Sequence, residues 1–158
     1  MSEFVFEAEG EAATDRLGAA LAAALPPGTT IALVGTLGAG KTRLVQAICA
    51  GLGVAREDVV SPTFVLCQRY DGTQTIHHLD AYRLRDEDEF RALGAVELMD
   101  SAGLTFIEWA DRVADCLPYE RIEIQIEVTG PTQRRFTIGA VGEPLQSVTS
   151  ELTRLLRP

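Results

Sequence analysis

The stretch that decides the fold is Thr30-Ile31-Ala32-Leu33-Val34-Gly35-Thr36-Leu37-Gly38-Ala39-Gly40-Lys41-Thr42. Residues 30–34 form a short apolar run, typical of a strand that is covered on both faces. Residues 35–42 match the pattern G-x-x-x-x-G-K-[ST] at every fixed position. After Lys41, apolar residues recur at helical spacing as far as the glycines at positions 51 and 53. A strand, a glycine-rich loop and a helix in this order predict a phosphate-binding P-loop.

The chemistry of phosphate binding explains these residue types. Glycines allow unusual backbone angles, so that successive N–H groups converge on phosphate oxygens, and the helix that follows adds the positive end of its dipole. We expect Lys41 to contact the β- and γ-phosphates and the Thr42 hydroxyl to bind Mg²⁺. The predicted nucleotide-binding residues of the loop are Gly35, Thr36, Leu37, Gly38, Ala39, Gly40, Lys41 and Thr42.

The composition narrows the class of protein. Lys41 is the only lysine among the 14 lysine and arginine residues, and it stands where a P-loop needs one. The net charge of −9 would repel a phosphate backbone, so we expect no direct binding of DNA, and contact with RNA only through a partner. The chain contains no asparagine, which excludes an N-K-x-D motif for guanine and favours ATP as the nucleotide.

Location and redox state also follow from the sequence. Apolar runs are shorter than the roughly 20 residues of a membrane span, and the first residues lack the pattern of a secretory signal. The three cysteines, Cys49, Cys67 and Cys116, show no CxxC spacing. They predict buried, reduced thiols and a cytoplasmic protein.

The other periodic segments predict an α/β fold in one domain, residues 1–158. Further strands are predicted at residues 4–6, 64–70, 75–79, 104–108, 122–128 and 134–138, and further helices at residues 12–25, 86–93, 95–100 and 145–156. We expect a P-loop NTPase-like three-layer sandwich. Its mixed sheet would have parallel central strands and an antiparallel pair at one edge.

A P-loop enzyme also needs a carboxylate near its metal, usually at the end of a buried strand. The apolar run 104–107 leads to Glu108, with Trp109 directly after it. Glu108 is therefore the candidate metal ligand beside Thr42. The alternative is an ordinary glutamate at a strand end, exposed to solvent.

Three further segments follow the P-loop in a specific order. They are Ser61-Pro62-Thr63-Phe64, His78-Leu79-Asp80-Ala81-Tyr82-Arg83-Leu84 and Ile107-Glu108-Trp109. Together with the P-loop they resemble the TsaE (YjeE) family over roughly residues 10 to 130. The resemblance implies a cytoplasmic ATPase of tRNA threonylcarbamoyladenosine (t6A) biosynthesis that acts with TsaD and TsaB. These partners modify adenosine 37 of tRNAs that read ANN codons, and hydrolysis would be weak without them.

The resemblance also implies roles for single residues. Lys41, Asp80 and Glu108 would be catalytic, and Thr42 and Glu108 would hold Mg²⁺. Thr63 would lie near the γ-phosphate or the metal, and Trp109 beside the nucleotide. The family commonly has an acidic residue after the first glycine of the loop, where this chain has Thr36. Because the phosphates are bound by backbone groups and by Lys41, we expect phosphate binding to survive this difference at Thr36.

Other interpretations of these residues stay open at this point. Asp80 could cap a turn or pair with Arg83 or Arg85, for which surface ion pairs are the simplest role. His77 and His78 are adjacent on a predicted strand, which directs them to opposite faces and favours structural roles. Two further functional hypotheses are a small P-loop kinase, and a nucleotide-dependent binding switch that does not require hydrolysis.

Overall fold

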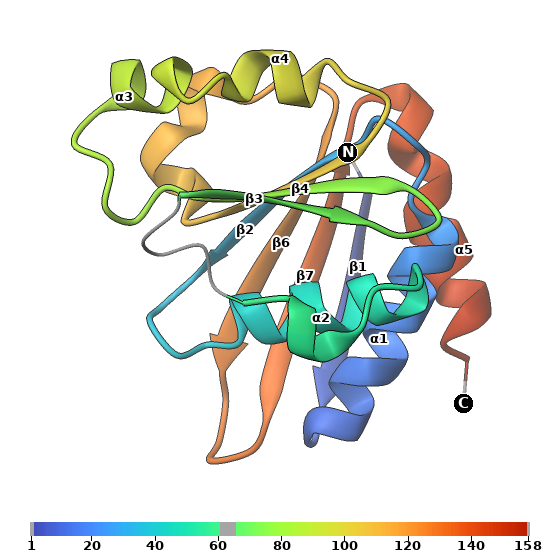
Figure 1. Ribbon diagram of the computed structural model, residues 1–158. Helices are drawn as coiled ribbons and strands as arrows, with labels where there is room; N and C mark the ends of the chain where they lie inside the picture. Colours follow the sequence, from blue (N-terminus) through green and yellow to red (C-terminus); the bar gives the residue numbers. More distant parts are fainter. Residues whose placement is uncertain (1, 61–65, 158) are drawn as a thin grey trace.

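The computed structural model of the chain describes residues 2–60 and 66–157. Its centre is one seven-stranded sheet in the spatial order β1-β7-β6-β2-β5-β4-β3 (Figure 1). The strands are β1 (Ser2–Ala8), β2 (Thr30–Gly35), β3 (Cys67–Asp71), β4 (Thr75–Asp80), β5 (Leu104–Glu108), β6 (Arg121–Val128) and β7 (Arg134–Val141).

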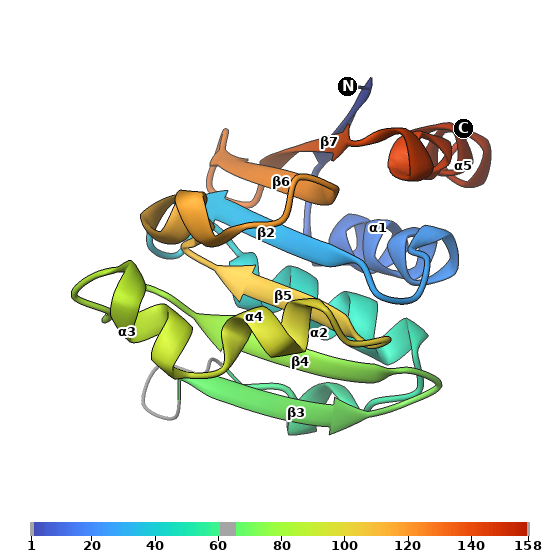
Figure 2. The same ribbon diagram turned by 90° about the horizontal axis from the view of Figure 1, so that it is seen from above.

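Helices cover both faces of this sheet. They are α1 (Glu11–Ala24), α2 (Lys41–Gly51), α3 (Glu87–Ala92), α4 (Ala95–Met99) and α5 (Gln146–Leu155), with 3₁₀ segments η1 (Arg56–Asp58), η2 (Ala110–Cys116) and η3 (Glu143–Leu145). Helices α1, α2 and α5 lie on one face, and α3, α4 and η2 lie on the other (Figure 2). Alternate residues of β2 divide between the two cores, since Leu33 packs in the α1–α2 core and Ala32 in the α3–α4 core. The α/β three-layer prediction is confirmed.

The sheet has parallel strands at its centre and antiparallel pairs at both edges. Strand β2 is parallel to both of its neighbours, β5 and β6, and β4 is parallel to β5. Antiparallel pairing joins β3 to β4 on one side, and β6 to β7 and β7 to β1 on the other. The prediction of parallel central strands with an antiparallel edge is confirmed, and β3 and β4 form the hairpin that the turn residues Asp71-Gly72 indicate in the sequence. Short connections join β3 to β4 and β6 to β7, and connections of this length allow only antiparallel neighbours.

Most predicted elements occur within a few residues of their expected limits. The strand expected from residue 64 begins at Cys67 in the described chain, and residues 64 and 65 lie outside it. All three cysteines are free, but only Cys49 is buried, so the prediction of three buried thiols is wrong for Cys67 and Cys116. No helix among the described residues is long and apolar enough to cross a membrane.

The sheet determines where the functional residues meet. In the register of the parallel strands, Glu108 at the end of β5 lies beside Leu33 of β2 and beside Asp80 of β4. The carboxyl ends of β2, β4 and β5 therefore lie at the same end of the sheet, where α2 begins. Ligands of open α/β sheets bind at this end.

Candidate functional site

The P-loop connects β2 to the first residue of α2. Gly38 and Gly40 have positive φ angles of 79° and 111°, and a Cβ atom at either position would contact nothing within 4 Å. The need for glycine is thus conformational rather than steric. Helix α2 begins at Lys41, and no side chain of the described residues caps it. Its first N–H groups lack intrahelical partners, which makes this end an anion site.

Lys41 is buried beside the loop. Its Nζ donates to the carbonyl oxygens of Gly35 (2.7 Å) and Thr36 (2.9 Å) and lies 3.9 Å from the centroid of the Trp109 ring. Burial lowers the pKa of the Lys41 ammonium, and the negative charges of nearby carboxylates, Glu108 foremost, oppose this shift. The only lysine of the chain therefore lies at the loop, as predicted.

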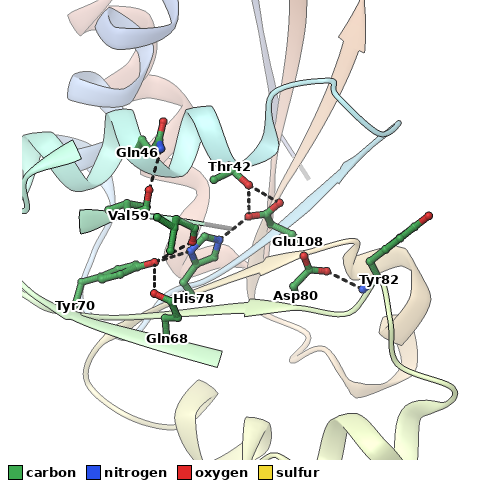
Figure 3. A network of polar contacts seen from close by, with 10 residues as sticks. Thr42, Gln46, Val59, Gln68, Tyr70, His78, Asp80, Tyr82 and Glu108 are labelled. Carbon is green, nitrogen blue, oxygen red and sulfur yellow. Dashed lines mark hydrogen bonds and ion pairs between the residues drawn. The ribbon is translucent and has the colours of Figure 1, made fainter. Parts of the chain in front are cut away.

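Thr42 and Glu108 are in direct contact. The Thr42 hydroxyl lies 2.9 Å from Oε1 and 2.7 Å from Oε2 of Glu108, so its single proton is shared between the two carboxylate oxygens (Figure 3). Glu108 is buried, which argues against the alternative of a strand-end glutamate in solvent. The two residues predicted as metal ligands are 66 positions apart in the sequence, and the parallel pairing of β2 with β5 brings them together.

His78 also contacts this carboxylate, which the sequence interpretation did not foresee. Its Nε2 lies 2.6 Å from Oε2 of Glu108, and its Nδ1 lies 3.2 Å from the hydroxyl of Tyr70. The sequence did contain a signal for this placement. His78 precedes Asp80 by two residues on β4, and residues two apart on a strand share a face. The face that carries the candidate Asp80 therefore also carries His78, whereas His77 belongs to the opposite face.

Asp80 caps a turn and also lines the cavity beside Lys41 and Glu108. Its Oδ1 accepts the backbone N–H of Tyr82 at 2.7 Å, so it does cap the turn after β4. It is also buried, and burial raises the pKa of its carboxyl, an effect that the Tyr82 N–H bond opposes. Arg85 pairs with Glu89 at 2.9 Å on the surface, in agreement with the simplest role predicted for it.

Two cavities share Gly38 and Gly40 of the P-loop, and a third, of about 490 Å³, adjoins Gly35, Thr36 and Trp109. The first, of about 450 Å³, is lined by Leu37, Gly38, Gly40, Lys41, Thr42, Arg43, Asp80, Tyr82, Arg83, Glu108 and Trp109. The second, of about 410 Å³, is lined by Gly10, Glu11, Thr14, Gly38, Ala39, Gly40, Arg43, Pro131, Thr132, Arg134 and Phe136. The first cavity collects the candidate catalytic residues of the described chain. The second lies on the other side of the same glycines, against α1 and the β6–β7 connection.

Trp109 has an unusual backbone conformation at the edge of the first cavity. Its φ and ψ angles of 59° and 39° are left-handed, which is uncommon for a bulky residue. Its ring packs against that of Tyr82, with 4.7 Å between the centroids, and lies under the Lys41 ammonium. The indole therefore lies at the lysine end of the P-loop, in contact with Tyr82. Thr63, the remaining predicted contact, lies outside the described residues.

The residues present fit a cation that arrives with phosphate groups. Within residues 2–60 and 66–157, no cluster of three or more His, Cys, Asp or Glu side chains could hold a metal alone. Thr42 and Glu108 nevertheless supply a hydroxyl and a carboxylate at the start of α2. Mg²⁺ prefers oxygen ligands and is usually held by one or two carboxylates, with phosphates and water completing its shell.

Comparisons with known proteins agree with this geometry. The model of the family "Threonylcarbamoyl adenosine biosynthesis protein TsaE" matches residues 8–136. The chain is 40% identical to the TsaE protein of Bacillus subtilis over 134 residues, 84% of this chain and 83% of the relative. It is 38% identical to the TsaE protein of Treponema pallidum over 125 residues, 79% and 92% of the two chains. The crystal structure of YdiB from Bacillus subtilis superposes with a TM-score of 0.78 at 28% identity, covering 97% of this chain and 95% of YdiB.

Proposed function

This chain belongs to the TsaE family of threonylcarbamoyl adenosine biosynthesis proteins, and we propose that it binds and hydrolyses ATP as the accessory ATPase of that pathway. The overall reaction is ATP and water to ADP and phosphate. The proposed place of action is the cytoplasm, where tRNA is modified. The proposed partners are TsaD and TsaB, which would hold the tRNA, because a chain with a net charge of −9 binds nucleic acid poorly by itself.

One observation carries the proposal. The chain's only lysine and the Thr42–Glu108 pair converge at the uncapped start of α2, directly behind the glycine-rich loop. A turn with a purely structural role needs none of these groups. Burying the charges of Lys41 and Glu108 costs free energy that such a turn would not offset. Phosphate binding needs each of the groups, since it uses an ammonium, free backbone N–H groups and oxygen ligands for Mg²⁺.

The proposed roles follow from position. Lys41 and the first N–H groups of α2 would stabilise the negative charge that grows on the phosphate oxygens as water attacks the γ-phosphorus. Mg²⁺, held by Thr42 and Glu108, would neutralise charge on the β- and γ-phosphate oxygens. Asp80 lines the same cavity, and burial raises the pKa of its carboxyl, so it is the carboxylate that we assign to the attacking water.

In this proposal the nucleotide extends across the two cavities that share Gly38 and Gly40. The cavity with Asp80 and Glu108 would take the γ-phosphate and the metal. The nucleoside would then leave the loop on the opposite side, into the cavity between Thr14, Phe136 and the β6–β7 connection. Exposed Pro131 offers an apolar surface, and Thr132 and Arg43 offer polar groups, which is the mixture that a purine site requires. In this arrangement Trp109 lies beside the phosphates and does not stack on the base.

The test is phosphate release from Mg²⁺-ATP, measured for the chain alone and with TsaB and TsaD from the same organism. We expect a slow rate alone that rises when the pair is added. Demonstrable ATP binding without any stimulation by the pair would contradict the partner assignment. The absence of both ATP binding and hydrolysis would contradict the proposed function itself.

Two other functions give different results with labelled ATP. A kinase would transfer the γ-phosphate to a small acceptor, and Arg83 in the first cavity is a group that could contact such an acceptor. Label found only in free phosphate would exclude this activity for the acceptors tried. A binding switch would support many turnovers of tRNA threonylcarbamoylation by a variant that binds ATP without hydrolysing it, whereas the ATPase proposal predicts that turnover stops.

A further inference from the structure

A chain of hydrogen bonds runs from the edge strand β3 to the start of α2. Tyr70 of β3 contacts His78 of β4, His78 contacts Glu108 of β5, and Glu108 contacts Thr42 of α2 (Figure 3). The Tyr70 hydroxyl also lies 3.2 Å from Oε1 of Gln68 and 3.3 Å from the carbonyl oxygen of Val60. Four elements of the fold therefore meet in one polar network behind the Glu108 carboxylate.

The direction of these hydrogen bonds follows from their chemistry. An ionised Glu108 can only accept, so Nε2 of His78 carries a proton and donates it to Oε2. In the tautomer with its proton on Nε2, Nδ1 is an acceptor, and it shares the single proton of the Tyr70 hydroxyl with two other acceptors in reach, Oε1 of Gln68 and the Val60 carbonyl oxygen. Burial raises the pKa of Tyr70 to about 12, which keeps this hydroxyl protonated at neutral pH. Both ring nitrogens thus have partners of the correct type, and the ring orientation is determined from both sides.

Packing alone does not account for this arrangement. His78 is fully buried, with Gln68 and Phe106 as its neighbours on β3 and β5, and a leucine would fill a similar volume without any polar group to satisfy. Buried polar networks are often no more stable than apolar replacements, so their presence calls for another reason. The reason available here is the contact with Glu108. The Thr42 hydroxyl and Nε2 of His78 both contact Oε2 of this carboxylate, so His78 can determine the orientation in which the carboxylate faces Thr42.

We propose that His78 is a positioning residue that holds Glu108 in the orientation in which it binds the Mg²⁺ of the bound nucleotide, and that Tyr70 in turn orients His78. The proposal rests on the proposed function, because His78 can orient a metal-binding carboxylate only if Glu108 binds the Mg²⁺ of a nucleotide. Groups that orient a metal-binding carboxylate typically change metal affinity by about 10- to 100-fold when they are removed.

The experiment measures Mg²⁺ binding separately from catalysis. Isothermal titration calorimetry gives the affinity for ADP in EDTA and at a series of Mg²⁺ concentrations, and fluorescence of Trp109, the only tryptophan, follows the same titration. For His78→Ala we expect the half-saturating Mg²⁺ concentration to rise about 10-fold or more, with ADP affinity in EDTA unchanged. His77→Ala is the matched control, since it alters the neighbouring residue on the opposite face, and it should behave as wild type.

Two more variants separate positioning from a general loss of structure. His78→Gln places an amide N–H donor within reach of Glu108 and should recover most of the Mg²⁺ affinity that His78→Ala loses. Tyr70→Phe removes one hydroxyl and should shift the half-saturating Mg²⁺ concentration less than His78→Ala does, by about 3-fold. If thermal unfolding shows that His78→Ala is not folded, Tyr70→Phe decides, and an unchanged Mg²⁺ requirement would overturn the proposal.

The outcomes distinguish this inference from the function on which it depends. A wild-type chain that binds no ADP, or binds it without any effect of Mg²⁺, contradicts the proposed function. A wild-type chain that shows the Mg²⁺ effect, together with a His78→Ala variant that matches His77→Ala, leaves the proposed function standing and overturns the role of His78.

Discussion

The charges of this protein fall into two regions that differ sharply in their surroundings. At the carboxyl end of the central strands, Lys41, Asp80 and Glu108 are only 5%, 4% and 3% exposed. On the surface, arginines form ion pairs such as Arg154 with Glu151 at 2.7 Å, where the arginine side chain is 66% exposed. The surface pair retains its hydration, and such pairs contribute little to stability. The buried charges lose their hydration, which costs free energy unless partners compensate for it.

The difference indicates which charges the fold is built to hold. Parallel strands β2, β4 and β5 end together and bring the buried groups to one cavity, although they are far apart in the sequence. Some surface pairs join neighbours on one helix, as in Arg154 and Glu151, and others join exposed residues of adjacent strands, as in Arg135 and Glu7. We propose that the buried set is maintained for binding, at some cost to stability, and that the surface set supports solubility. Four substitutions can break or sharpen this comparison.

The largest effect is expected for Lys41→Ala. The change removes the only lysine ammonium of the chain and leaves the carboxylates Asp80 and Glu108 without the buried positive charge that lines the same cavity. Phosphate release in the presence of TsaB and TsaD should fall by about 100-fold or more. Arg154→Ala, which removes a positive charge from the surface, should keep the wild-type rate. Hydrolysis by the Lys41→Ala protein at the wild-type rate would show that the buried set is not the catalytic one.

The next effect is expected for Glu108→Gln. The side chain keeps its size and can still contact Thr42, but it loses the charge that attracts Mg²⁺. The Mg²⁺ concentration for half-maximal ATP hydrolysis should rise by at least about 10-fold. Nucleotide affinity in EDTA should change little, since the P-loop backbone and Lys41 are intact. A Mg²⁺ requirement equal to that of wild type would remove Glu108 from the metal site.

Asp80→Asn should separate stability from activity. Burial raises the pKa of Asp80 in the folded chain, so ionising it at neutral pH costs the folded state more than the unfolded one. Asparagine avoids this cost and still accepts the Tyr82 N–H. The nucleotide-free variant should therefore melt a few degrees higher than wild type at pH 7. Phosphate release should fall, because the carboxylate assigned to the attacking water is lost.

The pH dependence of this stabilisation checks its cause. As the pH falls through the raised pKa of Asp80, the wild-type carboxyl becomes protonated and its penalty disappears. The melting temperatures of the variant and wild type should converge as the pH approaches about 4, the ordinary range of an aspartate. A difference that persists unchanged at that pH would point to packing rather than charge.

The smallest effect is expected for the surface pair. Arg154 binds Glu151 and lowers the pKa of its carboxyl, but both groups stay in contact with water, which screens their interaction. Arg154→Ala should leave the melting temperature within about one degree of wild type, at low and at high salt. A loss comparable to the changes at the buried set would show that the surface pairs carry more of the stability than we infer.

The sequence predicts the fold well where each segment carries its own signal. The strand and loop from Thr30 to Thr42 and the buried strand ending at Glu108 both have the expected structure, because an apolar run and glycine positions are local properties. The turn residues Asp71-Gly72 indicate a hairpin in the sequence, but its place at the second edge was not predicted, because the strand order depends on which hairpin packs at which side of the sheet. Residue patterns within one strand do not contain that information.

The same limit applies to the site. Lys41, Thr42, Asp80 and Glu108 could be selected from motifs, and the structure brings all four to one cavity. The spacing of His78 to Asp80 places both on one face of β4, but the contacts of His78 with Glu108 and Tyr70 depend on the register of β3, β4 and β5. The left-handed backbone of Trp109 was equally hidden, because it results from the tertiary packing that follows the end of β5.

The most direct test of the central claim is a crystal structure of the chain with Mg²⁺ and a non-hydrolysable ATP analogue. We predict that the phosphates lie in the P-loop within hydrogen-bonding distance of Lys41. The metal should contact the Thr42 hydroxyl and lie next to Glu108, and the base should occupy the cavity beside Thr14 and Phe136. A nucleotide bound elsewhere, or phosphates in the loop with Lys41 still bonded only to the Gly35 and Thr36 carbonyl oxygens, would contradict the account.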